Sequence, residues 1–347
     1  MTTTSSHLHE GAAIVTRGLT RHFNGPGRTT VHAVDDLDLE IGQGELVAFL
    51  GPNGAGKTTT LRMLTTLVPP TSGTAHVAGH DVVTAQREVR RSIGYVGQGN
   101  GAGLQQLGRD ELISQGRAYG LSRRDAHARA DELIHDLDLT EVARRKVSTL
   151  SGGQRRRLDI AMGLVHLPRV LFLDEPSTGL DPQNRANLQE LVRRLHQETG
   201  STVVLTTHYL EEADALAERV VVIDRGRVIA DDSASRLKSG LRDLVVLGFD
   251  DGDAAARATE RMARVGRGAT LDQVDDVVSL RSQGAHAEVG ELLVDLAGQG
   301  LPVRSVEVAR PTLDDVFLEL TGRSLRDAHE GATTDQDQTD QKDEVAA

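Results

Sequence analysis

The stretch Gly51-Pro52-Asn53-Gly54-Ala55-Gly56-Lys57-Thr58-Thr59 decides the fold. Its first eight residues match the pattern G-x-x-x-x-G-K-[ST] in full. An apolar run at 46–50 leads into it, and a helical pattern over 58–68 follows it. A glycine-rich turn between a strand and a helix lets backbone N–H groups face phosphates without a side-chain clash. We therefore expect a phosphate-binding loop for ATP, with Lys57 on the β- and γ-phosphates and Thr58 on Mg²⁺.

A pair of acidic residues follows a second apolar run, at 170–173. Asp174 and Glu175 would lie at the carboxyl end of this strand, where ligands bind in open α/β sheets. We expect Asp174 to hold Mg²⁺ through water and Glu175 to orient or deprotonate the attacking water. A strand that ends in acidic residues usually places them in solvent only. The phosphate-binding loop elsewhere in the chain is what favours the functional interpretation.

Further apolar runs at 202–205 and 219–223 indicate more strands of the same kind. Runs that are apolar on both faces are typical of central strands covered by helices on each side. They predict an α/β fold of the P-loop nucleotide hydrolase class with a largely parallel sheet. Residues 100–148 have helical patterns and few strand signals. We interpret about 100–150 as a helical subdomain inserted into this core.

The end of the chain predicts a second, smaller unit. Over 240–322, strand-like runs alternate with amphipathic helical patterns, which indicates a small α/β domain. The last helix of this unit should begin at Pro311-Thr312, which fits a capped helix start. Residues 1–12 and 323–347 are polar and poor in apolar side chains, and we expect both to be disordered tails.

The segment Leu150-Ser151-Gly152-Gly153-Gln154 narrows the assignment. By itself, Ser151 before two glycines is compatible with an ordinary helix N-cap. Its position between the phosphate-binding loop and the acidic pair closely resembles the arrangement in the ATP-binding cassette (ABC) family, where this segment is the signature. The resemblance covers about 13–235 and implies an ABC nucleotide-binding domain there.

The resemblance extends to three single residues. Phe23 resembles the aromatic residue that stacks on adenine, although a lone Phe would more often belong to the core. Gln98 resembles the glutamine that senses Mg²⁺ and the membrane partner. His208 resembles the switch histidine that contacts the γ-phosphate, although a lone histidine at a strand end is usually structural. The implied catalytic residues are therefore Glu175, His208, Lys57 and Gln98, with Thr58, Gln98 and Asp174 at the metal.

The segment at 305–322, SVEVARPTLDDVFLELTG, resembles the C-terminal signature of subunits related to the daunorubicin/doxorubicin resistance exporters. This resemblance implies an ATP-hydrolysing subunit that powers efflux of a drug-like or hydrophobic compound through a separate transmembrane permease. It also implies a homodimer in the ATP-bound state, in which Ser151, Gly152 and Gly153 of a second copy complete each site. Related subunits that export polysaccharides or lipids share parts of the segment.

Bulk properties limit the alternatives. The 347 residues carry a formal net charge of −12, which disfavours a nucleic-acid-binding role. No stretch approaches the ~20 apolar residues of a membrane span, and 1–11 lack the features of a secretory signal. We expect the chain on the cytoplasmic side of the membrane, held there only through the permease. The alternatives are a soluble ABC ATPase not coupled to transport, disfavoured by the single phosphate-binding loop, and an inactive cassette, disfavoured by the complete set of motifs.

Overall fold

The computed structural model describes residues 11–24, 29–99, 101–265 and 269–324. The chain divides into two compact units, with the boundary between Ala234 and Ser235. The predicted tails at 1–12 and 323–347 lie almost entirely outside the described residues. Within the described part of the chain, no helix is long and apolar enough to cross a membrane.

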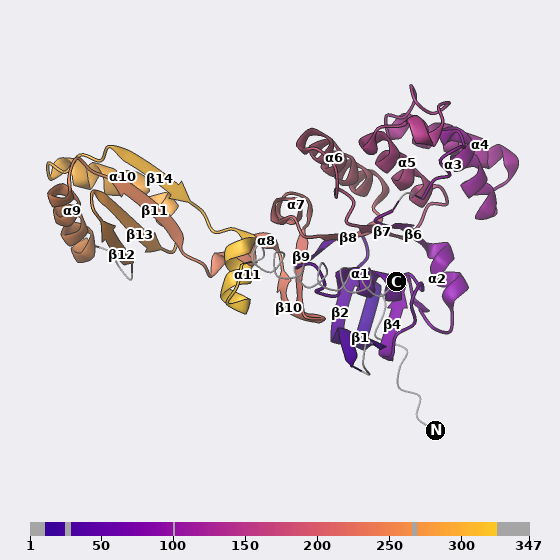
Figure 1. The fold of residues 1–347 in the computed structure, drawn as a ribbon, viewed down its shortest axis with the longest axis horizontal. Coiled ribbons are helices and arrows are strands. Elements are labelled where there is room, and N and C mark those ends of the chain that lie inside the picture. The colour runs from indigo at the N-terminus through magenta and orange to yellow at the C-terminus, as the bar shows by residue number, and fades with distance from the viewer. Residues whose placement is uncertain (1–10, 25–28, 100, 266–268, 325–347) are drawn as a thin grey trace, which may run out of the picture. The chain divides into compact units, whose positions relative to one another are not determined.

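A six-stranded sheet forms the centre of the first unit (Figure 1). Across the sheet the strands are β10 (Arg227–Asp232), β9 (Arg219–Asp224), β3 (Leu46–Leu50), β8 (Thr202–Thr207), β7 (Val170–Asp174) and β6 (Ile93–Val96). Five strands run parallel, and the edge strand β10 pairs antiparallel with β9. Every residue of β3, β7 and β8 is buried, as the apolar runs predicted. The predicted α/β class with a largely parallel sheet is confirmed.

A second, antiparallel sheet was not predicted from the sequence. Its order is β2 (Thr30–Gly42), β1 (Ala12–Asn24), β4 (Ser72–Val77) and β5 (His80–Asp81). Helix α1 (Lys57–Leu64) contacts strands of both sheets, and one apolar cluster runs through all three layers. Ile14 of β1, Leu61 of α1 and Phe49 of β3 belong to this cluster, and each has no exposed surface. The antiparallel sheet therefore packs against α1 and helps to hold this helix in place after β3.

Helix α1 is shorter than the predicted 58–68. It ends at Leu64 because Thr66 has a left-handed backbone (φ 64°), which a continuing helix cannot contain. The N–H groups of Leu67 and Val68 then bond back to the Arg62 carbonyl oxygen. The helix therefore ends before Pro69 and Pro70, and the prolines are not what stops it.

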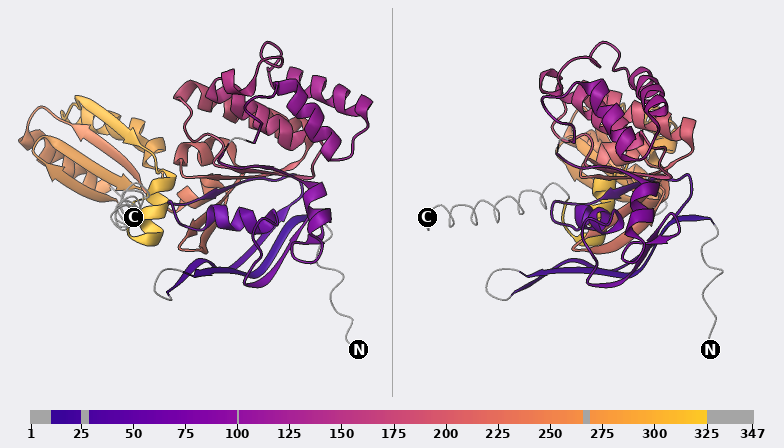
Figure 2. Two further views of the ribbon diagram at one scale, coloured as in Figure 1. Left: turned by 45° about the vertical axis from the view of Figure 1, so that its right-hand side comes forward. Right: turned by 90° about the vertical axis from the view of Figure 1, so that its right-hand side faces the viewer.

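Helices α3 (Gly108–Ala118), α4 (Arg123–Asp136) and α5 (Gly152–Leu164) lie at the top of the views in Figure 2, on the side of the six-stranded sheet that faces away from the antiparallel sheet. Of these, α5 packs against β6, and α3 packs against α4 and α5. Among the described residues, the unit also contains α2 (Gln86–Ser92), α6 (Pro182–Thr199) and α7 (Leu210–Leu216), and a 3-10 turn at Val147–Thr149. The Ser122 hydroxyl caps α4 and the Ser151 hydroxyl caps α5, each accepting a backbone N–H three residues on.

The second unit has its own antiparallel sheet and its own core. The sheet order is β12 (Thr270–Val274), β13 (Val277–Ser282), β11 (Asp243–Gly248) and β14 (Ser305–Ala309), and the helices are α8 (Ala234–Ser239), α9 (Gly252–Val265), α10 (Ala285–Gly298) and α11 (Leu313–Thr321). Val245, Phe249, Met262 and Leu296 are buried in its apolar cluster. Strand β12 was not predicted. The predicted cap is confirmed, because the Thr312 side chain accepts the N–H of the third helical residue.

Candidate functional site

The loop between β3 and α1 is shaped by glycines that no other residue can replace. A Cβ on Gly51 would lie 2.1 Å from the carbonyl oxygen of Ile223, and one on Gly56 would lie 2.3 Å from that of Ala33. Gly56 also has a φ of 105°, which is left-handed. The loop therefore lies directly against β2 and the end of β9, and α1 begins at its close. A helix start without side chains in front of it is suited to bind an anion.

Lys57, the first residue of α1, lies buried beneath this loop with 4% of its surface exposed. Its Nζ donates to the carbonyl oxygens of Gly51 at 2.7 Å and Pro52 at 2.9 Å. Burial lowers the pKa of Lys57 to about 8, although the charges of Glu175 and Asp174 oppose the change. The loop thus holds an ammonium group that is poorly solvated, and a bound phosphate would stabilise its charge.

Oxygen atoms converge where α1 meets the end of β7. The Thr58 hydroxyl donates to Oδ1 of Asp174 at 2.9 Å, and the Thr206 hydroxyl donates to the same atom at 2.8 Å. The Gln98 amide nitrogen donates to the Thr58 hydroxyl at 3.4 Å. Asp174 itself is buried, with 1% of its surface exposed. The three residues predicted at the metal therefore contact one another in a chain.

Glu175 and His208 come from neighbouring parallel strands and face each other. Oε2 of Glu175 lies 3.5 Å from Nδ1 of His208 and accepts the Thr178 hydroxyl at 3.1 Å. The imidazole of His208 is the main cause that lowers the pKa of Glu175, against the effect of burial. Glu175 has a φ of 46°, in the left-handed region of the backbone. Residues other than glycine rarely adopt this conformation, and those that do are concentrated at functional sites. A carboxylate fixed in this way is available to accept a proton or orient water.

One residue of the site was missed as a functional candidate. Arg156, on α5, is buried and donates to the carbonyl oxygens of Pro176 at 2.8 Å, Gly97 at 2.7 Å and Asp174 at 3.1 Å. It thereby joins the segments that carry Gln98 and Glu175. The sequence signal was an arginine five residues after Ser151, but nothing in the run of three arginines indicates which of them is buried.

A cavity of about 590 Å³ lies in front of the phosphate-binding loop. It is lined by Phe23, Val31, His32, Ala33, Asn53, Gly54, Ala55, Gly56, Lys57, Thr58, Thr59, Gln98 and Glu175. Phe23, the residue predicted to stack on adenine, is 38% exposed, and the Arg21 guanidinium lies 4.6 Å from its ring centre. A flat aromatic ring and a phosphate-binding loop on one cavity fit the two ends of a nucleotide.

The segment Ser151–Gln154 is not part of this cavity lining. Its residues begin α5, where the Ser151 hydroxyl accepts the Gln154 N–H at 3.3 Å and Oε1 of Gln154 accepts the Ser151 N–H at 3.0 Å. Ser151 and Gly152 are exposed, whereas Gly153 is buried. The structure therefore brings together the loop, Gln98, Asp174, Glu175 and His208, but leaves the signature segment facing solvent.

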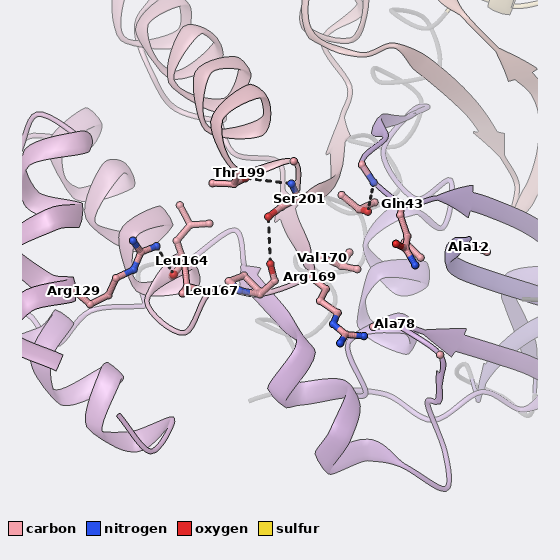
Figure 3. Close-up of a pocket in the computed structure, with 16 residues that line it drawn as sticks. Ala12, Gln43, Ala78, Arg129, Leu164, Leu167, Arg169, Val170, Thr199 and Ser201 are labelled. Atoms are coloured by element: carbon pink, nitrogen blue, oxygen red, sulfur yellow. Dashed lines mark hydrogen bonds between the residues drawn. The ribbon is translucent and has the colours of Figure 1, made fainter. Parts of the chain in front are cut away.

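A second cavity of about 590 Å³ lies at the opposite ends of the parallel strands (Figure 3). It includes Val170 and Thr202, which are the first residues of β7 and β8, together with Arg129, Leu167 and Arg169. Parallel sheets bind ligands at the carboxyl ends of their strands. This cavity lies at the amino ends and contains none of the motif residues, so we place the functional site at the loop after β3.

Comparisons with known proteins agree with this geometry. The ABC transporter family profile matches residues 34–178. The daunorubicin/doxorubicin resistance ATP-binding protein DrrA of Streptomyces peucetius is 44% identical over 91% of this chain and 94% of its own length. The linearmycin resistance ATP-binding protein LnrL of Bacillus subtilis (strain 168) is 35% identical over 87% and 96% of the two chains.

A solved structure gives the same result. It is a dimeric ATP-binding cassette in a post-hydrolysis state, bound to ADP and Pi. It is 27% identical, with a TM-score of 0.58, and the match covers 63% of this chain and 98% of that one. With the fold, the phosphate-binding loop and the relatives in agreement, the chain belongs to the ATP-binding proteins of the ABC transporter family, which bind and hydrolyse ATP.

Proposed function

We propose that this chain powers the efflux of a drug-like or hydrophobic compound through a separate transmembrane permease. The observation that carries the proposal is the convergence of Lys57, Thr58, Asp174, Glu175 and His208 at one edge of the sheet. It occurs in a chain that matches a daunorubicin/doxorubicin resistance protein over 94% of that protein's length. Hydrolysis at this edge is the energy source, and the permease supplies the path for the compound.

Each residue of the site has a separate part in this proposal. Lys57 moves from the carbonyl oxygens of its own loop to the β- and γ-phosphates of ATP, because phosphate oxygens are stronger acceptors for an ammonium group. Glu175 orients and deprotonates the attacking water, and its lowered pKa keeps it ionised for this purpose. His208, held beside Glu175, contacts the γ-phosphate. Phe23 stacks on adenine from the open side of the cavity.

The oxygen atoms around Thr58 fit Mg²⁺. This ion prefers hard oxygen ligands and keeps several waters, so it needs few ligands from the protein. The Thr58 hydroxyl and the Asp174 carboxylate are 2.9 Å apart, and the Gln98 side chain reaches the same hydroxyl. Thr58 and Gln98 would bind the ion directly and Asp174 through water. The ion would neutralise charge on the phosphates.

A second copy of the chain completes each site in this proposal. The described residues that line the cavity do not include Ser151–Gln154, and transferred phosphoryl groups need donors around them. The exposed segment Ser151–Gln154 provides a hydroxyl and the amides of a helix start. A head-to-tail homodimer with two ATP molecules between the copies brings this segment of one copy to the loop of the other. The related dimeric cassette supports a two-copy arrangement.

The chain contacts the membrane only through the permease in this proposal, on the cytoplasmic side. The formal net charge of −12 opposes both nucleic acid and the anionic surface of a membrane. A soluble ABC ATPase not coupled to transport is the alternative.

Co-purification distinguishes the two functions. The tagged full-length chain carrying Glu175→Gln is isolated from detergent-solubilised membranes of the organism that encodes it, with Lys57→Ala as the ATP-binding-deficient control. We expect one multi-span membrane protein in near-equal amount with the chain. Expression of both proteins should then raise resistance to a hydrophobic drug, and Glu175→Gln should remove that resistance. Recovery with ribosomes or DNA, and with no membrane protein, would support the alternative.

A further inference from the structure

Three side chains with metal-binding atoms meet on the first two strands. His22 of β1 and His32 of β2 are direct cross-strand partners, and their ring centres are 4.0 Å apart. Asp35 of β2 completes the group, and one ligand atom from each residue lies within 4.8 Å of the others. Binding one ion would require the side chains to rotate until the three atoms lie about 2 Å from it, the distance of Zn–N and Zn–O bonds.

An irregularity in the strand pairing creates this arrangement. In a regular strand His32 and Asp35, three positions apart, would point to opposite faces. The pairing shifts between Arg21↔Val34 and His22↔His32, so one extra residue is inserted in β2 at Ala33. The insertion turns Asp35 to the face on which His22 and His32 lie.

The other contacts of the group leave the ligand atoms available. The Nε2 atom of His22 is buried and has no hydrogen-bond partner among the residues that the structure describes. Arg227 donates twice to Asp35, at 3.0 Å and 2.6 Å, and both bonds go to Oδ2. A carboxylate that binds a metal through one oxygen is commonly held by a hydrogen bond to the other. Arg227 therefore fixes Asp35 in position, while its charge limits how tightly a cation binds.

We propose that His22, His32 and Asp35 form a binding site for a divalent transition-metal ion of the Zn²⁺ class. Two imidazole nitrogens and one carboxylate oxygen suit Zn²⁺ and leave a position for water. Two nitrogen ligands disfavour Mg²⁺ and Ca²⁺, which select oxygen. His32 is exposed, so the ion reaches the site from solvent. Of the three ligands, His32 also lines the nucleotide cavity, as Phe23 does, but the site needs no nucleotide.

The test uses the full-length chain without nucleotide, so that its outcome does not depend on the proposed ATPase and export function. Because His7 and His9 are close together in the sequence, they are both replaced by Ala in the reference protein to remove a competing site. Calorimetric titration with ZnCl₂ should give one ion per chain. His32→Gln should weaken binding at least ~10-fold, as expected for loss of a ligand, while His135→Gln, an exposed histidine on α4, should not change it.

Two further measurements distinguish the loss of a metal ligand from misfolding of the variant. Saturating Zn²⁺ should raise the melting temperature of the reference protein but not of His32→Gln or Asp35→Asn, because only a bound ion stabilises the folded state. Co²⁺ in place of Zn²⁺ should give the visible absorption bands of a nitrogen- and oxygen-ligated ion, lost in the same variants. Equal Zn²⁺ affinity in His32→Gln and the reference protein, or no stoichiometric binding once His7 and His9 are replaced, would overturn the proposal.

Discussion

A hydrogen bond of 2.9 Å joins the Thr58 hydroxyl to Oδ1 of Asp174, two residues 116 positions apart in the sequence. It ties the first turn of α1 to the last residue of β7. Thr206, from the neighbouring strand, donates to the same oxygen at 2.8 Å. Because both hydroxyls hold one carboxylate oxygen, a change at any of these three residues moves the others, and the site behaves as one unit.

The lowered pKa of Lys57 predicts that ATP binding takes up a proton. Near pH 8 the buried ammonium is partly deprotonated, since its pKa is about 8. The phosphates of ATP favour the charged form of Lys57, so ATP binding raises the pKa of this residue. About half a proton per chain is therefore taken up from solution at pH 8. ATP affinity should therefore fall as the pH rises through 8. Calorimetry in two buffers of different ionisation enthalpy measures the uptake.

Lys57→Arg is the matched control, because a guanidinium stays protonated at this pH. Its heat of ATP binding should not depend on the buffer. Lys57→Ala should bind ATP weakly and hydrolyse none, whereas Lys146→Ala, at an exposed lysine, should act as wild type. Normal turnover by Lys57→Ala would contradict the assignment of the loop.

Glu175→Gln should bind ATP but hydrolyse it at least ~10²-fold more slowly, because the amide keeps the hydrogen bonds and loses the basicity. The variant should accumulate as an ATP-bound dimer, which gel filtration with ATP detects alongside a phosphate-release assay. Since the pKa of Glu175 is lowered, the wild-type rate should not decline through its protonation until the pH is below the ordinary range of a glutamate. A variant that hydrolyses at the wild-type rate would exclude Glu175 as the base.

Ser151→Arg should block dimer formation and leave ATP binding to the monomer intact. The larger, charged side chain would clash at the proposed contact between copies. Ser122→Arg is a matched control, because Ser122 is also exposed and caps a helix of the same unit. Both changes remove an N-cap and should cost about 1 kcal/mol of stability. Sedimentation in a Glu175→Gln background would separate them, and equal dimer formation by both would reject the composite site.

Arg156→Met should destabilise the first unit by about 3 kcal/mol, because two buried carbonyl oxygens and one partly buried carbonyl oxygen lose a charged donor. We also expect slower hydrolysis, since the segments that carry Gln98 and Glu175 lose their common anchor. Arg157→Met, on the next residue of α5 and only partly buried, serves as the control in thermal unfolding. Equal melting temperatures for the two variants would show that the hydrogen bonds of Arg156 do not stabilise the first unit.

A chain truncated after Ser239 should still bind ATP. The second unit has a separate apolar cluster and contributes no residue to the nucleotide cavity. The truncated and full-length chains should therefore have similar affinities for a fluorescent ATP analogue. Circular dichroism must first establish that the truncated chain is folded, and weak binding by a folded protein would count against independent units.

Local sequence signals predicted the central sheet and most of the site. Four apolar runs gave β3, β7, β8 and β9, since strands buried on both faces need little context to be identified. The motifs at 51–58 and 174–175 then placed the site at the carboxyl edge of these strands. The helix caps at Ser151 and Thr312 could also be predicted from the sequence, because a capping side chain contacts a residue only three positions away.

Irregular, exposed and long-range features were not predicted. Strand β1 pairs with β2 and β4 through several irregular steps, so its residues do not alternate regularly between the two faces. Four of the five residues of β12 are exposed, and its sequence therefore has no apolar pattern. The burial of Arg156 depends on carbonyl groups from two other segments. The pairing of β1 with β4 and the burial of Arg156 depend on residues far away in the sequence, whereas β12 pairs with β13 just after it and was missed because it is exposed.

Ser151 and Gln154 form a capping box at the start of α5, and this box leaves the Ser151 hydroxyl free to donate a hydrogen bond. A serine hydroxyl has two lone pairs and one proton. The Gln154 N–H occupies one lone pair of the Ser151 oxygen, so the helix cap does not use the proton of the hydroxyl. The hydroxyl can therefore donate a hydrogen bond to a negatively charged group from outside while the helix start remains intact. In the proposed head-to-tail dimer, docking and release at this point would therefore require no unwinding of α5, and a contact that forms and breaks once in every cycle would carry no folding penalty.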